Sequence, residues 1–251
     1  MKNAETKTED RRCLGPAANT CYKNYLSMGF GVNSVAMYLM LLKKGIKFEA
    51  VYSNHGADWP ETAEYVKIFT AKHPVTILNP TVSKPFGDGR KTWRSLIEYC
   101  SDRKIIPQQW PRWCTGDWKK DVVSKYVEKP CFMFIGIDAG EAHRAKIHSN
   151  GRIEYRWPLI EEGIDREGCK QIIKDHGLPV PPKSGCYICP FQRPSQWKRL
   201  RHEHPNLFCI AEQLEQNSGR TYKKGQSLKQ LVKHSQEGFW PEQYPPCECG
   251  L

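Results

Sequence analysis

Short apolar runs alternate with stretches of helical pattern between residues 22 and 137 of the 251-residue chain. Each of these runs predicts a strand, and they cover residues 22–28, 48–54, 75–79 and 131–137. Ser34–Lys44 is apolar nearly all round, which predicts a helix packed against a sheet. A second helix is expected near Pro60, with Asp58 as its cap. This alternation predicts an α/β fold with an open, mainly parallel sheet flanked by helices.

The character of the sequence divides the chain into three parts. Residues 1–21 are polar and charged and are expected to form a flexible N-terminal arm. Residues 22–160 form the predicted α/β domain, in which 80–112 contains no clear strand and is interpreted as a lid or a partner-binding loop. Residues 161–251 are predicted to be a helical, cysteine-containing, basic C-terminal segment.

Charge and cysteine usage narrow the class of protein. Lys and Arg number 38 against 27 Asp and Glu, and the net charge of +11 favours polyanionic partners such as nucleic acid, with a solvated basic surface as the alternative. The 11 cysteines are odd in number, and the chain is too long for a small secreted disulfide scaffold. The longest apolar run, Val35–Leu42, is far shorter than the ~20 residues that cross a bilayer. We therefore expect a cytoplasmic protein with reduced thiols and no membrane partner.

A glycine-containing turn, Ser27 to Ser34, links the first predicted strand to the first predicted helix. Its sequence, SMGFGVNS, matches neither the dinucleotide-binding nor the Walker pattern. A turn at the carboxyl end of a parallel strand can nevertheless hold a phosphate on backbone N–H groups and a helix dipole. A purely structural turn remains the alternative.

Four further motifs follow the turn in chain order. They are SNHGADWPETAEYV (53–66), RWCTGDWKKDVVSKYV (112–127), GIDAGEAHRA (136–145) and PPKSGCYICPF (181–191). Together with the turn they resemble the PP-loop ATP pyrophosphatases, within the PAPS reductase-like branch of the adenine nucleotide alpha-hydrolase-like superfamily. The resemblance covers roughly residues 22–210. Phe30 stands where the family turn has a glycine, and Asn33 where it has an aspartate.

The resemblance implies a nucleotide site with ATP and Mg²⁺. Lys119 and Arg144 would neutralise charge on a leaving pyrophosphate, with Ser34 as a third catalytic candidate. A salt-bridge role for Glu141 is the alternative to nucleotide binding. The residues that would bind the nucleotide are Ser27, Gly29, Gly31, Asn33, Ser34, Asp58 and Glu141.

The pair Cys186 and Cys189 has the spacing of two thiolates on one tight knuckle. Further ligands would come from Cys114 and from Cys249 or Cys247, and a redox dithiol is the rival interpretation. Zn²⁺ and an iron–sulfur centre suit such ligands equally. The clusters of the resembled relatives favour [4Fe-4S].

The C-terminal ECGL resembles the end of assimilatory sulfonucleotide reductases, whose cysteine attacks sulfur; Cys249 matches it. That reductase is one alternative function, and a non-catalytic, zinc-stabilised nucleic-acid-binding module is another. The favoured hypothesis is an ATP pyrophosphatase that adenylates a nucleic-acid oxygen, on DNA or tRNA, so that sulfur from a cysteine desulfurase can replace it. The resemblance points to DNA phosphorothioation. Basic stretches at 197–205 and 219–234 would bind the nucleic acid, with Trp197 and Tyr222 stacking on bases.

Overall fold

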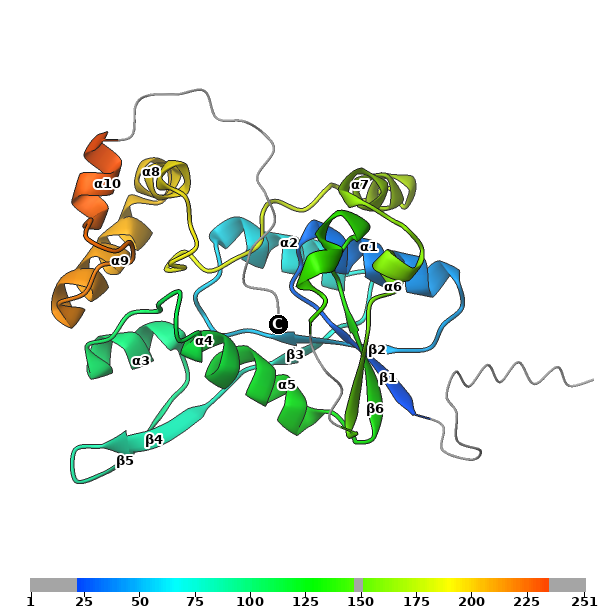
Figure 1. Cartoon of the computed structure of the whole chain (residues 1–251), viewed down its shortest axis with the longest axis horizontal. Helices are drawn as coiled ribbons and strands as arrows, with labels where there is room; N and C mark the ends of the chain where they lie inside the picture. The colour runs from blue at the N-terminus through cyan, green and yellow to red at the C-terminus, as the bar shows by residue number, and fades with distance from the viewer. Residues whose placement is uncertain (1–21, 147–150, 235–251) are drawn as a thin grey trace, which may run out of the picture.

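The computed structural model describes residues 22–146 and 151–234, which are built around a five-stranded parallel sheet (Figure 1). The strands lie in the order β3-β2-β1-β6-β7, and every neighbouring pair is parallel. Their bounds are β1 Lys23–Ser27, β2 Glu49–Ser53, β3 Thr76–Leu78, β6 Cys131–Ile135 and β7 Ile153–Arg156. The predicted α/β fold class is confirmed, and so are the four predicted strands; β7 was not predicted.

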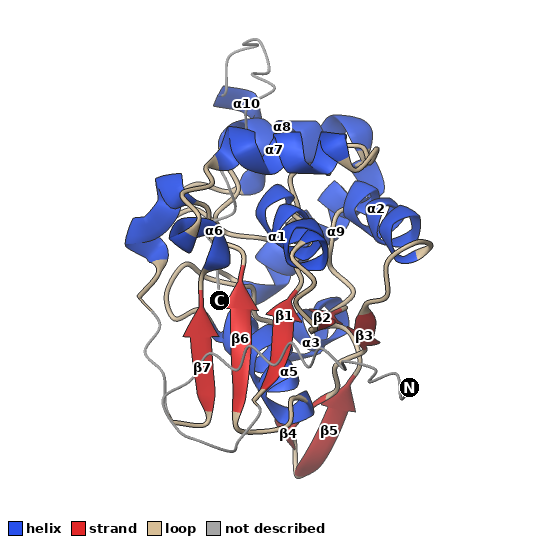
Figure 2. Cartoon of the chain, turned by 90° about the vertical axis from the view of Figure 1, so that its right-hand side faces the viewer, coloured by secondary structure: helices blue, strands red, loops and turns tan. Residues whose placement is uncertain are grey.

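Successive side chains along each strand point to opposite faces of the sheet, and each face packs into a different hydrophobic core. Leu26, Tyr52 and Phe134 face the core that contains α1 (Val32–Lys43), α2 (Pro60–Thr70) and α7 (Arg166–Asp175). The intervening residues Tyr25, Val51, Met133 and Ile135 face the core under α5 (Asp121–Tyr126). α1 is buried from Val32 to Leu41, which confirms the expectation from its apolar pattern. Figure 2 shows the strands with α5 on one side and α1 near their carboxyl ends.

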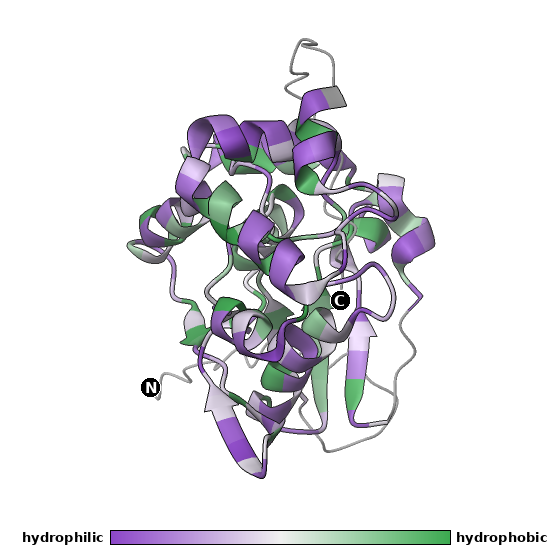
Figure 3. Ribbon diagram, turned by 90° about the vertical axis from the view of Figure 1, so that its left-hand side faces the viewer, coloured by the Kyte–Doolittle hydropathy of each residue, from purple (hydrophilic) through white to green (hydrophobic). Residues whose placement is uncertain are grey.

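A third core joins the middle of the chain to its C-terminal helices. Trp93, Trp118 and Trp197 are fully buried in it. Figure 3 shows hydrophilic and hydrophobic residues alternating along the helices on this face, as expected for helices with one buried side. The elements concerned include α3 Leu96–Arg103, α8 Pro194–Glu203, α9 Pro205–Ser218 and α10 Leu228–His234. The short elements α4 Trp113–Thr115, η1 Gly116–Lys120, η2 Ala139–Arg144 and α6 Pro158–Glu161 complete the described chain.

Two sequence-based expectations are wrong, the absence of a strand from residues 80–112 and the cap of α2, whereas a lid or partner-binding role for 80–112 stays a prediction. Residues 80–112 contain an antiparallel hairpin, β4 (Val82–Phe86) and β5 (Gly89–Trp93), followed by α3. Trp93 anchors that hairpin in the core, whereas most of its other residues are exposed and so leave no apolar run in the sequence. Asp58 does not cap α2, because the N-cap is Trp59 and no side chain caps the helix. No helix in the described ranges is long and apolar enough to span a membrane.

Candidate functional site

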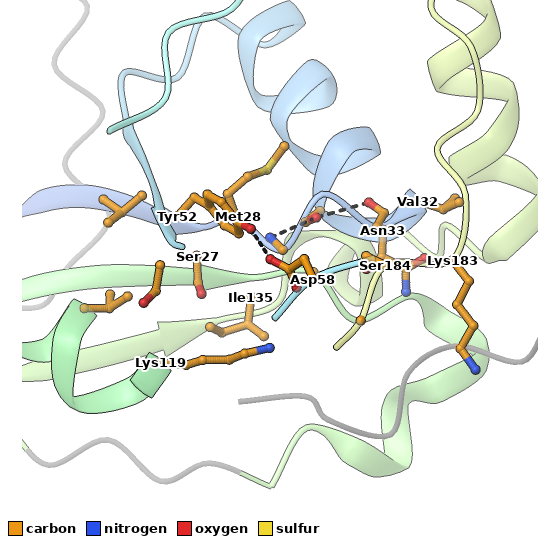
Figure 4. A pocket seen from close by; sticks show the side chains of 18 of the residues that line it. Ser27, Met28, Val32, Asn33, Tyr52, Asp58, Lys119, Ile135, Lys183 and Ser184 are labelled. Carbon is orange, nitrogen blue, oxygen red and sulfur yellow. Dashed lines mark hydrogen bonds between the residues drawn. The ribbon is translucent and has the colours of Figure 1, made fainter. Parts of the chain in front are cut away.

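A cavity of about 180 Å³ opens at the carboxyl ends of β1, β2 and β6 (Figure 4). The chain leaves the central strand β1 toward β2 on one side, and β6 pairs with the other side, so this edge is a topological switch point. Ser27, Ser53 and Ile135 end these three strands and line the cavity. The predicted phosphate turn, η1, η2 and residues 182–185 supply the remaining walls.

The phosphate turn presents an uncapped helix N-terminus to this cavity. Gly31 is the N-cap of α1 and makes no side-chain cap hydrogen bond. The Gly29 N–H donates to Ser34 Oγ over 3.3 Å, and Ser34 Oγ donates to the Gly31 carbonyl over 3.1 Å. Free N–H groups in the first turn of a helix and its dipole favour an anion. The residue with left-handed backbone geometry is Phe30, at φ 51°, rather than either glycine.

The contacts of Phe30 explain why a phenylalanine stands where the resembled turn has a glycine. Its ring is 1% exposed and makes edge-on contacts with Tyr52 and Phe69, with ring centroids 4.9 and 5.8 Å away. Left-handed backbone geometry destabilises a non-glycine residue by about 1 kcal/mol, and burial of the Phe30 ring stabilises the fold by more than this. The aromatic side chain therefore fixes the turn to the α1–α2 core.

The side chain of Asn33 is held by hydrogen bonds to two polar residues, Asp138 and Arg166. Its Nδ2 donates to Asp138 Oδ2 over 2.9 Å, and Arg166 Nη1 donates to its Oδ1 over 3.3 Å. Asp138 is 2% exposed. The amide thus links α1 to the start of η2, and its orientation is set by a carboxylate on one side and a guanidinium on the other.

Four predicted charged residues line the cavity, namely Asp58, Lys119, Glu141 and Arg144. Arg144 Nη1 donates to Glu141 Oε2 over 2.8 Å, so the salt-bridge alternative for Glu141 is present alongside its position in the cavity wall. Asp58 accepts a short hydrogen bond from the Tyr52 hydroxyl. Burial and the Asp58 charge raise the pKa of Tyr52, which stays a donor. In Figure 4 Lys119 extends from its helix toward the side of the cavity where Asp58 lies.

A second, smaller cavity of about 20 Å³ shares Lys119 with the first and is lined by thiols. Cys114, Cys186 and Cys189 all border it, together with His55 and Lys119. A short antiparallel bridge between Asp58 and Cys186 brings the C-x-x-C knuckle to the segment after β2. The knuckle is closed by the Cys189 N–H, which donates to the Cys186 carbonyl over 3.1 Å.

His55 is a buried side chain in contact with this knuckle. It is fully buried, its Nδ1 accepts the Ala57 N–H over 3.2 Å, and its Nε2 lies 3.3 Å from Cys186 Sγ and 3.5 Å from Asp58 Oδ1. Burial lowers the pKa of His55, but the combined effect of Cys186 and Asp58, which raises the pKa, is larger. The pKa of His55 is therefore raised overall. These three side chains place potential metal-ligating atoms within 4.8 Å of one another.

Burial also sets the acid–base character of the other groups around the thiols. It raises the pKa of the Cys114 and Cys189 thiols, and nearby Lys119 acts in the opposite direction. For Lys119 itself burial acts to lower the pKa, but Cys186, Asp58 and Cys189 raise it above its ordinary value. Lys119 therefore carries a positive charge at neutral pH, between the two cavities.

The structure brings most of the predicted site residues together. The larger cavity is lined by Ser27, Gly29, Gly31, Asn33, Ser34, Asp58, Lys119, Glu141 and Arg144. The predicted metal ligands Cys114, Cys186 and Cys189 share the smaller one. Cys247 and Cys249 lie outside the described residues, so their predicted roles stay predictions. Trp197 and Tyr222 are 0% and 4% exposed and contact each other in a tilted arrangement, so the prediction that they stack on bases is wrong.

Several site residues were not predicted. Arg166, Ser184 and Gly136 line the larger cavity, and His55 lines the smaller. His55 had a usable signal, because it follows a predicted strand at the ligand-binding edge of the sheet. The others come from segments whose approach to the turn depends on tertiary packing.

Comparisons with known proteins show what the chain is similar to. No protein-family profile matches the sequence. An uncharacterized protein of Methanocaldococcus jannaschii, MJ0973, is 25% identical over 207 residues, which is 74% of this chain. The chain spans about half, 46%, of the length of that relative. The crystal structure of a phosphoadenylyl-sulfate (PAPS) reductase from Candida auris, in a phosphate complex, matches 63% of this chain and 75% of its own, with 15% identity and a TM-score of 0.43.

Proposed function

We propose that the chain is an ATP pyrophosphatase that adenylates a nucleic-acid oxygen for replacement by sulfur, most specifically in DNA phosphorothioation. The observation that carries the proposal is the position of Lys119, which lines both the phosphate-turn cavity and the thiol cavity. Such an arrangement suits a reaction in which a phosphoryl group is activated next to the site where sulfur is handled. A non-catalytic zinc-stabilised module has no need of a cation shared between two cavities.

The larger cavity suits an adenine nucleotide with its phosphates on the turn. The first-turn N–H groups of α1 would donate hydrogen bonds to the phosphates, with Lys119, Arg144 and Lys183 around them. Mg²⁺ would enter with the nucleotide, because it keeps most of its ligands as phosphate oxygens and waters. Asp58 and Glu141 are the carboxylates available in the wall to support it.

The thiol cavity fits a thiophilic metal centre. Three cysteines and a histidine line it, and these are residue types that ligate Zn²⁺ or an iron–sulfur cluster, although the ligand atoms within 4.8 Å of one another belong to His55, Asp58 and Cys186. Cys114, Cys186 and Cys189 would hold a [4Fe-4S] cluster, or Zn²⁺, with His55 next to Cys186. When bound, such a centre would supply thiophilic chemistry for the sulfur-transfer step. Cys249 or Cys247 would be the remaining ligand.

The chemistry balances in two displacements. A non-bridging oxygen of a DNA phosphate attacks the α-phosphorus of ATP, which forms a phosphoanhydride to AMP and releases pyrophosphate. Lys119 and Arg144 stabilise the charge that develops on the leaving pyrophosphate. Hydrosulfide, released when a thiol reduces a persulfide from a cysteine desulfurase, then attacks the DNA phosphorus and expels AMP. The products are a phosphorothioate, AMP and pyrophosphate.

The test is the fate of α-labelled ATP with anaerobically purified protein, in the presence of DNA, tRNA or neither. AMP and pyrophosphate in a one-to-one ratio, formed only with one nucleic acid, would support the proposal and identify that substrate. ATP that survives in all three mixtures would refute it. The same protein is then assayed with PAPS, adenylyl sulfate and reduced thioredoxin. Release of sulfite would favour the sulfonucleotide reductase.

A further inference from the structure

Trp110 is far more exposed than any other large hydrophobic side chain in the described parts of the chain. It is 84% exposed, and the next is Leu42 at 52%. It lies in the loop between α3 and α4, directly before the Arg112–Thr115 segment that borders the thiol cavity. A tryptophan held in water contributes little to folding, so its position calls for a partner.

The loop that carries Trp110 is anchored on both sides. Ile106 is 1% exposed, Gln109 Nε2 donates to the Pro190 carbonyl over 3.2 Å, and Arg220 Nη1 donates to Gln108 Oε1 over 3.4 Å. In Figure 1 the loop rises from α3 toward the side of α8 and α9. Gln108 and Arg112, two residues before and after Trp110, both line the thiol cavity. Trp110 is therefore held at the rim of that cavity.

The surroundings of this rim are cationic and aromatic. Arg220 is exposed and contacts the loop through Gln108, and Arg193 is exposed two residues after Phe191, which lines the cavity. The Arg112 guanidinium lies over the Phe191 ring, 5.2 Å from its centroid. Exposed aromatic rings among arginines are the chemistry by which proteins hold single-stranded nucleic acid, with bases on the rings and phosphates on the cations.

We infer that Trp110 is a stacking platform for one base of a single-stranded or locally opened nucleic acid. Stacking there brings the adjoining phosphate to the rim of the thiol cavity, which Lys119 also lines. Arg220 and Arg193 hold neighbouring phosphates. The inference rests on the proposed function and deepens it by assigning the strand state of the substrate. It also replaces Trp197 and Tyr222, which are buried, as the base-stacking side chain.

The test measures separately the contribution of base stacking and the contribution of phosphate contacts to binding. Anisotropy titrations compare a labelled oligothymidylate of about 12 nucleotides with an abasic deoxyribose-phosphate strand of equal length, over a range of salt concentrations. The full-length wild-type protein is expected to bind the thymidine strand about 10-fold more tightly. Trp110→Ala removes this preference and leaves the slope of log K against log salt unchanged, because the phosphate contacts remain. Trp110→Phe retains most of the preference.

Two variants serve as matched controls. Arg220→Gln is expected to reduce the salt slope by about 0.7 and to keep the preference for bases. Phe86→Ala removes another exposed aromatic side chain, 40% exposed and located on the hairpin, and should change neither quantity. A wild-type protein without base preference, or a Trp110→Ala protein that keeps it, would overturn the inference.

The stacking inference and the proposed function can fail separately. AMP formation by a protein that shows no base preference would reject the stacking platform alone. A Trp110-dependent base preference in a protein that leaves ATP intact would reject the pyrophosphatase alone. A third outcome is that Trp110→Ala weakens binding of a cysteine desulfurase but keeps the preference for bases. The rim would then be a protein-docking site, contrary to the inference.

Discussion

Gly136 lies against the backbone of Ser34 so closely that a Cβ on it would stand 2.9 Å from both the Cα and the N of Ser34. Gly136 directly follows β6, and Ser34 lies in the first turn of α1. Backbone atoms in a helix cannot move aside as the end of a side chain can. The absence of a side chain at 136 is therefore what lets the helix N-terminus approach the carboxyl end of β6 and shape the phosphate side of the cavity.

Gly136→Ala should therefore push α1 away from β6. We expect a loss of about 1–3 kcal/mol in the free energy of unfolding and at least a tenfold weaker affinity for ATP. Urea denaturation and calorimetric titration measure the two effects. Gly29→Ala is the control, because a Cβ there meets nothing within 4 Å and should leave the unfolding free energy unchanged. Equal stability and ATP affinity in Gly136→Ala would show that the close approach is dispensable.

Asn33→Asp restores the residue of the resembled family, yet the structure predicts a cost. The new carboxylate would replace the amide that donates to Asp138 Oδ2 over 2.9 Å, and Asp138 is 2% exposed. Two buried carboxylates at that distance repel, or one takes up a proton. We expect a loss of about 2 kcal/mol in unfolding free energy and no gain in ATP affinity.

The double variant Asn33→Asp/Asp138→Asn gives the matched test, since it exchanges donor and acceptor. It should recover at least half of the stability that the single variant loses in thermal or urea unfolding. A single variant that is as stable as wild type and binds ATP more tightly would contradict this account of Asn33.

The fold was largely predictable because its central strands are apolar runs. β6 is an uninterrupted apolar run, and β1 and β2 place consecutive buried apolar residues on both faces of the sheet, which is the pattern of a central parallel strand. The edge strand β7 has one buried residue, Ile153, and the hairpin strands contain lysines and Pro85, so neither gives the same signal. These elements are fixed by pairing and by Trp93, which only tertiary structure reveals.

The candidate site was predictable where its residues share a motif. The turn from Ser27 to Ser34 falls at a strand end, and topology alone places it at the cavity. The contact of His55 with Cys186 spans 131 positions of sequence and depends on the bridge between Asp58 and Cys186. The left-handed backbone geometry of Phe30 could not be predicted either, because sequence rules assign that geometry to glycine.

Lys119→Met tests the cation shared by the two cavities. Loss of the charge removes a group that favours the thiolate forms of Cys114 and Cys189, so the pKa of both thiols should rise further. Alkylation of the metal-free protein by iodoacetamide near pH 7.5 should slow several-fold, by about one order of magnitude at most. AMP formation should fall by about 100-fold or more, in line with removal of a transition-state cation.

Lys120→Met is the control for Lys119→Met, because Lys120 is exposed and lines neither cavity. It should alter neither alkylation nor AMP formation. Mass spectrometry after timed alkylation assigns the rate to each cysteine. Equal alkylation profiles for Lys119→Met and wild type would mean that the charge does not act on the thiols.

Glu49→Gln tests an ionic link on the far side of the sheet. The Glu49 carboxylate accepts from Thr76 Oγ1 over 2.9 Å and from Tyr126 Oη over 2.5 Å, and lies 3.1 Å from Lys23 Nζ. Burial alone would raise the pKa of Glu49, but the hydrogen bonds from Tyr126, Lys23 and Thr76 lower it overall. The charged form therefore joins β2 to β1, β3 and α5.

A lowered pKa means that this stabilisation is complete above the ordinary glutamate value of about 4.3 and is lost as the pH falls through it toward the folded-state pKa. At pH 7 we expect Glu49→Gln to lose about 1 kcal/mol of unfolding free energy, and the difference from wild type should shrink below about pH 4. Thermal unfolding at a series of pH values measures it. Glu64→Gln, on the exposed face of α2, is the control and should match wild type throughout. A difference for Glu49→Gln that persists unchanged below pH 4 would assign its effect to shape rather than to charge.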